Sequence, residues 1–168
     1  MVIVLSIEGT ITMKIYKFDI LFQEVPNHIS LGFYVCGCRL RCVGCHSPEL
    51  WSEQNGFTLT EEFFKSLLLK YSDKISCILF LGGEWHPKEL TDFLSLAEQA
   101  NLKTALYTGL NDVPQTIKAH LDYLKVGPWT EALGGLASPT TNQIFWDVKN
   151  GRKLNHLFQQ PDLQKEIP

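Results

Sequence analysis

The stretch "SCILFLGGEWHPKELTDFLSLAEQANLKTALYTG" (76–109) indicates the fold class most clearly, because it holds a complete strand–helix–strand unit. Residues 76–83 are a short, continuously apolar run that ends in glycines, which is typical of a strand buried on both faces. Residues 87–101 predict an amphipathic helix, and residues 103–109 predict a second strand. The apolar side chains of the helix share one face: Leu90, Phe93, Leu94 and Ala97.

The same alternation extends on both sides of this unit. The further elements that we expect are strands at 14–23, 28–36 and 123–127 and helices at 58–72, with Thr58 and Thr60 as candidate caps, and at 112–121, with Asp112 as cap. Alternating strands and helices imply a parallel sheet with right-handed crossovers. A chain of 168 residues supplies too few strands to close a full barrel. We therefore predict an α/β fold, an open, partial (β/α) barrel of mostly parallel strands.

The two ends of the chain depart from this alternation. After Gly127 a long connection, 127–143, is rich in Gly, Pro and Thr, and residues 144–158 predict a C-terminal β-hairpin around Asn150-Gly151, a favourable type I′ pair. Met13 with the strand after it resembles a natural start. Residues 1–12 are therefore interpreted as an upstream extension, and residues 13–168 as a single domain.

Composition excludes several classes of function. The net charge of −3 argues against a nucleic-acid partner, because a surface that follows phosphates usually carries a basic excess. No apolar run approaches the roughly 20 residues of a membrane span, and the first residues lack the basic region and cleavage site of a secretory signal. We expect a cytoplasmic protein, in which clustered cysteines bind metal more often than they form disulfides.

Four of the five cysteines lie in "CGCRLRCVGCHSPELW" (36–51), and three of them have the spacing Cys38-x3-Cys42-x2-Cys45. A structural zinc site usually takes four ligands in two separated pairs, and no second pair exists here. Three thiolates on a four-iron cluster leave one iron without a protein ligand, and that iron can chelate a substrate. Cys36 and Cys77 are interpreted as small buried residues rather than ligands.

This spacing resembles the signature of the radical S-adenosylmethionine (SAM) superfamily. The longer stretch "YVCGCRLRCVGCHSPELW" (34–51) resembles the activating proteins of anaerobic (class III) ribonucleoside-triphosphate reductases. The resemblance also includes "GGE", "LYTG", "LKVGPW" and "TTNQ", at 82–84, 106–109, 124–129 and 140–143. Two departures are present: Trp85 and His86 separate the GGE motif from Pro87, and Val126 stands where relatives often have an acidic residue.

The resemblance implies a [4Fe–4S] cluster held by Cys38, Cys42 and Cys45. Its open iron would chelate SAM, and one electron, from a flavodoxin-like donor, would cleave SAM to methionine and a 5′-deoxyadenosyl radical. That radical would take a hydrogen from a glycine of the partner, anaerobic ribonucleoside-triphosphate reductase, and leave a glycyl radical. No catalytic residue beyond the cluster and SAM is needed, because the protein mainly orients the cofactors.

The carboxyl ends of parallel strands bind ligands, so we expect the SAM contacts there. Gly82 and Gly83 would let the backbone approach SAM, while Glu84 would accept hydrogen bonds from its ammonium group. Thr108 would bind the ribose or methionyl end, and Lys125 the carboxylate. The alternatives are an ordinary turn for the glycines and Thr108, a surface position for Glu84, and a Lys125 that extends to solvent.

Two other functions remain open. One is a small radical SAM enzyme with a small-molecule substrate, of the 7-carboxy-7-deazaguanine synthase type, and the other is a non-catalytic metal-binding module. For the activating enzyme, we expect loop 127–143 to dock the reductase through Trp129 and Leu133. The competing interpretation is that Trp129 packs under the C-terminal hairpin.

Overall fold

The computed structural model describes residues 12–159, so all but the last residue of the predicted extension 1–12 lies outside the described residues. The strands and α-helices in chain order are β1 (Lys14–Leu21), β2 (Ser30–Val35), β3 (Phe57–Thr58), α1 (Glu61–Tyr71), β4 (Cys77–Leu81), α2 (Pro87–Gln99), β5 (Lys103–Tyr107), α3 (Gln115–Lys118), β6 (Tyr123–Val126), β7 (Ile144–Asp147) and β8 (Arg152–Lys153). No helix within 12–159 has both the length and the apolar character that a membrane crossing requires.

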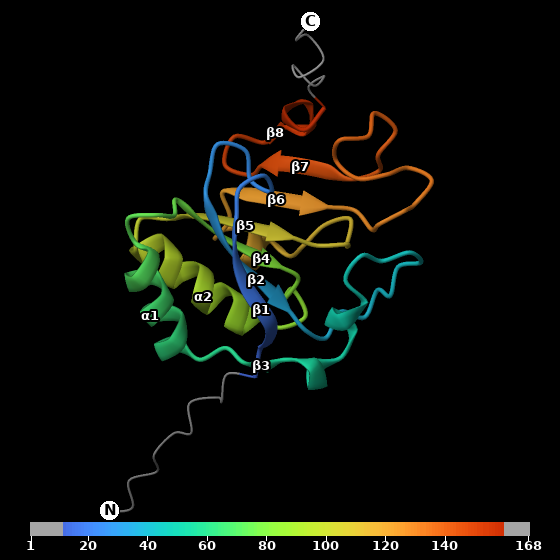
Figure 1. Ribbon diagram of the computed structural model, residues 1–168. Helices are drawn as coiled ribbons and strands as arrows, with labels where there is room; N and C mark the ends of the chain where they lie inside the picture. Colours follow the sequence, from blue (N-terminus) through green and yellow to red (C-terminus); the bar gives the residue numbers. More distant parts are fainter. Residues whose placement is uncertain (1–11, 160–168) are drawn as a thin grey trace, which may run out of the picture.

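The strands form one sheet in the order β3-β1-β2-β4-β5-β6-β7-β8 (Figure 1). The four central strands, β2, β4, β5 and β6, are parallel to one another, as the alternating sequence predicts. The outer pairs are antiparallel. Within residues 12–159 the terminal strands β3 and β8 do not pair with each other, so the sheet is open. The α/β class and the C-terminal hairpin are confirmed, whereas a barrel is not.

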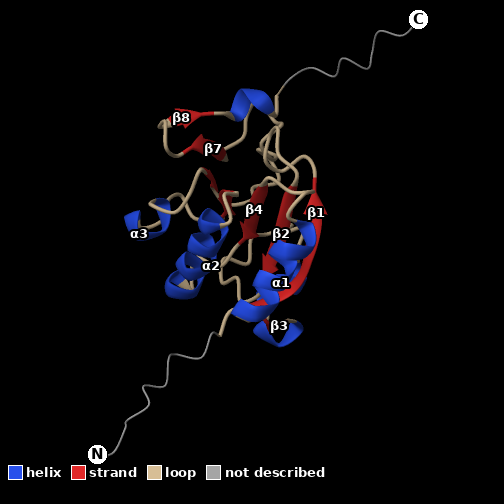
Figure 2. Cartoon of the chain, turned by 90° about the vertical axis from the view of Figure 1, so that its left-hand side faces the viewer, coloured by secondary structure: helices blue, strands red, loops and turns tan. Residues whose placement is uncertain are grey.

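Helices α1 and α2 pack on one face of this sheet (Figure 2). Their apolar stripes meet the strands in an aromatic cluster, in which the Phe64 ring lies 5.2 Å from Phe33 and 4.9 Å from Phe93, and Phe80 lies 5.3 Å from Phe33. All four rings are buried. Thr60 caps α1, since its Oγ1 accepts a hydrogen bond from the Phe63 amide at 3.2 Å. Of the two candidate caps, Thr60 is confirmed.

The opposite face of the sheet is covered by connecting segments rather than helices. Phe145 of β7 packs there against Tyr123 and Phe158, with ring centroids 5.8 and 5.0 Å apart. The Tyr107 hydroxyl donates a hydrogen bond to the carbonyl of Glu24, which fastens the β1–β2 connection over the strands. Side chains on this face alternate with those of the helix-covered face, so β4, β5 and β6 are buried on both sides.

Two local predictions are wrong. Helix α3 covers only Gln115–Lys118, because the proline at 114 disfavours a helical residue before it, and Asp112 instead pairs with Lys118 at 2.7 Å. The β7–β8 turn is not type I′, which requires positive φ at both central residues, and Asn150 is not in that region. The Asp147 carboxylate holds Asn150 instead, accepting from its backbone N at 3.1 Å and its side-chain amide at 2.8 Å.

Candidate metal centre

The predicted site residues gather at the carboxyl ends of the four parallel strands, a region called the rim below. Residues 36–47, called the cysteine loop, follow β2, and Glu84 and Thr108 follow β4 and β5. Leu81, Tyr107 and Lys125 pair across β4, β5 and β6, so the three strands end side by side. Figure 1 shows the cysteine loop in cyan and loop 127–143 in orange at the end toward which the arrows of β5 and β6 point.

Backbone hydrogen bonds close the cysteine loop at its base. The amides of Gly37 and Cys38 both donate to the carbonyl of Leu50, at 2.7 and 3.0 Å. Gly37 has a φ of +100°, a conformation that a residue with a side chain rarely adopts. Farther along, the Cys45 amide donates to the Cys42 carbonyl at 3.1 Å. The turn that carries the three candidate ligands is therefore shaped by its own backbone.

The thiols of Cys38, Cys42 and Cys45 are free and half-buried. Burial raises the pKa of Cys38, and the backbone amides of Leu40 and Arg41 act against this by donating to its sulfur. Among residues 12–159, no three His, Cys, Asp or Glu side chains gather around a point that would hold one metal ion. A cuboidal cluster binds each thiolate through a different iron, so it does not need such convergence. Three accessible soft donors in one short loop fit an iron–sulfur cluster.

The other two cysteines are fully buried, as predicted. Burial raises the pKa of Cys36, and it raises that of Cys77 to about 12. Full burial keeps both of these sulfurs away from a cluster at the surface of the cysteine loop, whereas Cys38, Cys42 and Cys45 are only half-buried.

Glu84 presents a buried carboxylate oxygen at the rim. Its Oε1 accepts a hydrogen bond from Thr108 Oγ1 at 2.6 Å, and that same hydroxyl oxygen accepts from the Leu110 amide at 3.0 Å. Its Oε2 is buried and has no hydrogen-bond partner. Burial raises the pKa of Glu84, although the Thr108 hydrogen bond opposes this. An unpaired buried acceptor of this kind is costly unless a donor reaches it, and a cation with N–H groups is the best match.

Lys125 lies near Glu84 but makes no ion pair with it in the described part of the chain. Its Nζ donates to the Gly127 carbonyl at 3.3 Å and lies 5.7 Å from the centre of the Tyr107 ring. Burial lowers the pKa of Lys125 to about 8, and the nearby Cys42 and Glu84 partly oppose this. The amine thus lies close to the rim, where an anionic group would raise its pKa toward the ordinary value.

Contacts within the protein explain why the GGE motif has glycine at both positions. Gly82 and Gly83 have φ values of +85° and +111°. A Cβ on Gly82 would lie 2.6 Å from the Trp85 ring, and one on Gly83 would lie 3.3 Å from Met13. The turn therefore needs glycine whether or not a ligand approaches it.

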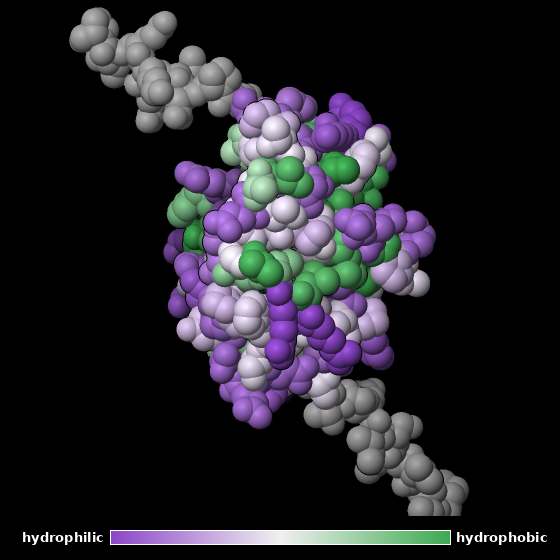
Figure 3. All heavy atoms as spheres, turned by 90° about the vertical axis from the view of Figure 1, so that its right-hand side faces the viewer, coloured by the Kyte–Doolittle hydropathy of each residue, from purple (hydrophilic) through white to green (hydrophobic). Residues whose placement is uncertain are grey.

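Loop 127–143 packs on the cysteine loop. The ring of Trp129 lies 4.4 Å from the ring of His46. Beside this contact, Val43 is 87% exposed and Leu40 and Leu110 are 40% and 38% exposed, so the rim carries apolar surface. Figure 3 views the molecule from the rim side and shows apolar patches between hydrophilic side chains. This contact of Trp129 with the cysteine loop is neither of its two predicted roles, docking of the reductase and packing under the C-terminal hairpin.

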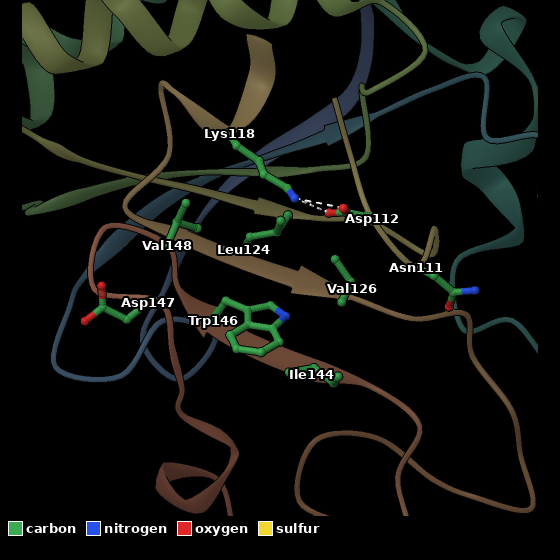
Figure 4. A pocket seen from close by; sticks show the side chains of 10 residues that line it. Asn111, Asp112, Lys118, Leu124, Val126, Ile144, Trp146, Asp147 and Val148 are labelled. Carbon is green, nitrogen blue, oxygen red and sulfur yellow. Dashed lines mark hydrogen bonds and ion pairs between the residues drawn. The ribbon is translucent and has the colours of Figure 1, made fainter. Parts of the chain in front are cut away.

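A cavity of about 370 Å³ lies on the helix-facing side of β6 and β7 (Figure 4). Leu124, Val126, Ile144 and Trp146 line it, and the Asp112–Lys118 pair lies at its edge. No cysteine and none of the predicted SAM contacts lines this cavity. Its apolar walls hold no combination of groups that suggests chemistry.

Sequence reasoning left Trp85 without a definite role. The structure places its indole against both the GGE turn and the start of the cysteine loop, where Nε1 donates to the Cys36 carbonyl at 3.1 Å. The available signal was the departure itself: a large aromatic residue stands next to Glu84 where the resembling proteins continue directly to proline.

Comparison with known proteins agrees with this geometry. The pyruvate formate-lyase-activating enzyme of Clostridium pasteurianum is 40% identical over 78 residues, which make up 43% of this chain and 33% of that protein. The chain thus spans about a third of the length of this relative. A family model described as a 4Fe-4S single cluster domain matches residues 29–124, more than half of the chain, and this range includes the three cysteines and every predicted SAM contact except Lys125. The chain belongs to this family of 4Fe-4S single cluster domains.

Proposed function

We propose that this chain is a radical SAM activating enzyme that generates a glycyl radical on another protein. The observation that carries the proposal is the pair of buried, incompletely compensated groups beside the cysteine loop. Burial raises the pKa of the Glu84 acid and lowers that of the Lys125 amine. A site with one acid oxygen that lacks a hydrogen-bond partner and one amine that lacks an anionic partner suits a zwitterion, and the amino acid end of SAM carries both an ammonium and a carboxylate group.

Each residue then has a definite role. Cys38, Cys42 and Cys45 would hold a [4Fe–4S] cluster through their thiolates, with one iron left open. When bound, the cluster and SAM supply an electron and a carbon-centred radical that removes a hydrogen atom from the target. Glu84 Oε2 would accept from the ammonium group of SAM, while Thr108 keeps Oε1 in place.

Lys125 would provide the opposite charge. Its amine would donate to the SAM carboxylate, and that contact would raise its pKa from about 8 toward the ordinary value. Gly82 and Gly83 would allow the conformation of the turn rather than leave space for SAM, because protein atoms fill the space beside both. We propose these contacts in spite of the two departures in sequence, since Trp85 and Val126 leave Glu84 and Lys125 at the rim.

The target is proposed to be anaerobic ribonucleoside-triphosphate reductase, with a flavodoxin-like electron donor and a cytoplasmic location. The motifs around the cysteines support the reductase. The relative from Clostridium pasteurianum is named for pyruvate formate-lyase, so another glycyl-radical enzyme of that kind is the second candidate. The apolar rim formed by Leu40, Val43 and Leu110 suits a protein target, because apolar surface around a site is typical of protein interfaces.

The test is an anaerobic assay with the reconstituted protein, SAM and a chemical reductant, with either the reductase or pyruvate formate-lyase added. We expect 5′-deoxyadenosine in both mixtures, and a glycyl-radical signal in electron paramagnetic resonance (EPR) spectra with the reductase. A glycyl radical on pyruvate formate-lyase but not on the reductase would show that the proposed target is wrong and that the proposed activity is right. Absence of 5′-deoxyadenosine in every mixture would contradict the proposal.

A further inference from the structure

Trp85 contacts a residue that lies 49 positions earlier in the sequence. It directly follows Glu84, and its Nε1–H donates to the carbonyl of Cys36 at 3.1 Å. Cys36 is the first residue of the cysteine loop and lies two positions before Cys38. Among residues 12–159, no other side-chain hydrogen bond joins the cysteine loop to residues 82–86. The Trp85 indole thus joins the residue next to Glu84 to the backbone two positions before Cys38, a candidate cluster ligand.

Two glycines make room for this indole. A Cβ on Gly82 would lie 2.6 Å from Cη2 of Trp85, and a Cβ on Gly37 would lie 3.0 Å from its Nε1. Both glycines have positive φ, at +85° and +100°. The ring therefore fills the space between the two turns. Because Gly37 and Gly82 have no side chain, the backbone of each turn can lie in close contact with the Trp85 ring.

The neighbouring residue lies at the same junction, although its Nε2 makes no hydrogen bond there. His86 Nε2 lies 3.5 Å from Glu53 Oε1, an atom that would also lie 3.0 Å from a Cβ on Gly37. Glu53 belongs to the short helical turn Glu53–Asn55, just after the cysteine loop. The insertion of Trp85 and His86 before Pro87 thus provides contacts to both sides of the cysteine loop.

We propose that Trp85 is a positioning residue that fixes Cys38 relative to Glu84. The hydrogen bond to Cys36 and the contacts at both glycines set the distance between the loop that would hold the cluster and the acid that would hold the ammonium group. The consequence for SAM binding rests on the proposed function, whereas the positioning of the loop does not. Small errors in the placement of bound groups can cost a large factor in reaction rate, so a rigid link here has a clear use.

The test uses Trp85→Phe, which keeps an aromatic ring between the two turns and removes the N–H donor. Trp146→Phe is the matched control, because Trp146 lies in β7 and lines the cavity away from the rim (Figure 4). The metal-free full-length proteins are treated with iodoacetamide under reducing conditions, and alkylation of each cysteine is followed by mass spectrometry. The buried Cys77 reports global opening.

Loss of one hydrogen bond should speed the alkylation of Cys38 by about fivefold in Trp85→Phe, with Cys77 still protected and Trp146→Phe like the wild type. An unchanged rate at Cys38 would overturn the proposal. Equal acceleration at Cys38 and Cys77 would also overturn it, because Trp85 would then stabilise the whole fold rather than position this loop.

A second readout uses the reconstituted proteins and titrates SAM while the cluster EPR signal is recorded. Trp85→Phe should keep its iron content and bind SAM about fivefold more weakly, whereas unchanged affinity would contradict the role in SAM binding. If the wild type took up no cluster or ignored SAM, the proposed function would fail, and the alkylation experiment would still decide the role of Trp85.

Discussion

Ionisable side chains at the two ends of the parallel strands differ in whether they have partners of opposite charge. At the amino ends, the buried Asp122 carboxylate is fully paired: Lys149 and Lys103 donate to it at 2.9 and 3.0 Å, and the backbone N of Thr104 donates at 3.0 Å. At the carboxyl ends, Glu84 keeps an oxygen without a partner, and Lys125 makes no ion pair among the described residues.

The effect on the pKa values follows this difference. Burial opposes the charge of Asp122, but the two lysines and the backbone overcome it, and the pKa of Asp122 is lowered. At the rim, burial prevails, so the pKa of Glu84 is raised and that of Lys125 is lowered. The ion pairs at the amino ends therefore stabilise the fold. The incompletely paired groups at the rim destabilise it, and a bound ligand with complementary charges would offset this cost.

The largest effect is expected at the cysteine loop. Cys42→Ser should abolish the broad visible absorbance and the iron content of the reconstituted protein, because one of three thiolates is lost. Its melting temperature without metal should stay within a few degrees of the wild type, since Cys42 is only half-buried. Cys77→Ala is the control, and we expect it to retain iron. An iron content in Cys42→Ser equal to that of the wild type would contradict the assignment of Cys42 as a ligand.

A second large effect is expected at the amino ends. Asp122→Ala should lower the free energy of unfolding by about 2 kcal/mol, because the Thr104 backbone N–H loses its buried acceptor and two lysines lose their partner. Asp112→Ala is the matched control, since its pair with Lys118 is more exposed and should contribute about 0.5 kcal/mol. Urea denaturation measures both variants.

The pH dependence offers a check on the same residue. The folded pKa of Asp122 lies below 3.8, so its stabilisation is complete above that value and is lost as the pH falls through the folded pKa. Asp122→Ala should therefore lose less stability between pH 5 and pH 3 than the wild type. Equal losses would show that this carboxylate is not the paired group inferred here.

At the rim, removal of a charged side chain should raise the free energy of unfolding, whereas at the amino ends it should lower it. Lys125→Met should stabilise the metal-free protein by about 1–2 kcal/mol at pH 7, because a buried amine is removed from a site that disfavours its charge. In the wild type, the favourable contribution of neutral Lys125 is present above pH 10.5 and is lost as the pH falls toward about 8. The variant should lack this part of the pH dependence, measured by urea denaturation. Destabilisation by Lys125→Met would contradict the contrast between the two ends.

The smallest effect concerns the apolar surface beside the site. Val43→Ser should weaken binding to the target enzyme by about fivefold while leaving iron content and reductive SAM cleavage unchanged, because Val43 is 87% exposed and contributes little to the fold. Leu69→Ser, 80% exposed on α1, is the matched control and should bind like the wild type. Surface plasmon resonance under anaerobic conditions compares them, and equal affinities would place the docking surface elsewhere.

The sequence predicted the central strands well, because strong local signals specify them. The apolar run before Gly82 is typical of a buried strand, and parallel order brings Glu84, Thr108 and Lys125 to one edge. Helix α3 was overextended, because the pattern around Ile117 suggested more turns than Pro114 allows. The tie between Trp85 and Cys36 could not be predicted, since it depends on how two distant glycine turns meet in space.

The paired Asp122 was also beyond prediction, because its partners Lys103 and Lys149 come from separate parts of the chain. A single acidic residue before a strand carries no local signal of burial. The charges at the rim were easier to find, since both follow from motifs at strand ends.

The central claim is that the rim holds an iron–sulfur cluster and SAM side by side. The most direct measurement is the EPR spectrum of the anaerobically reconstituted, reduced wild-type protein before and after the addition of SAM. We expect the signal of a reduced [4Fe–4S] cluster, changed by SAM in the wild type and changed only at higher SAM concentrations in Glu84→Gln. A protein that binds no cluster, or a cluster spectrum that SAM does not alter, would contradict the account.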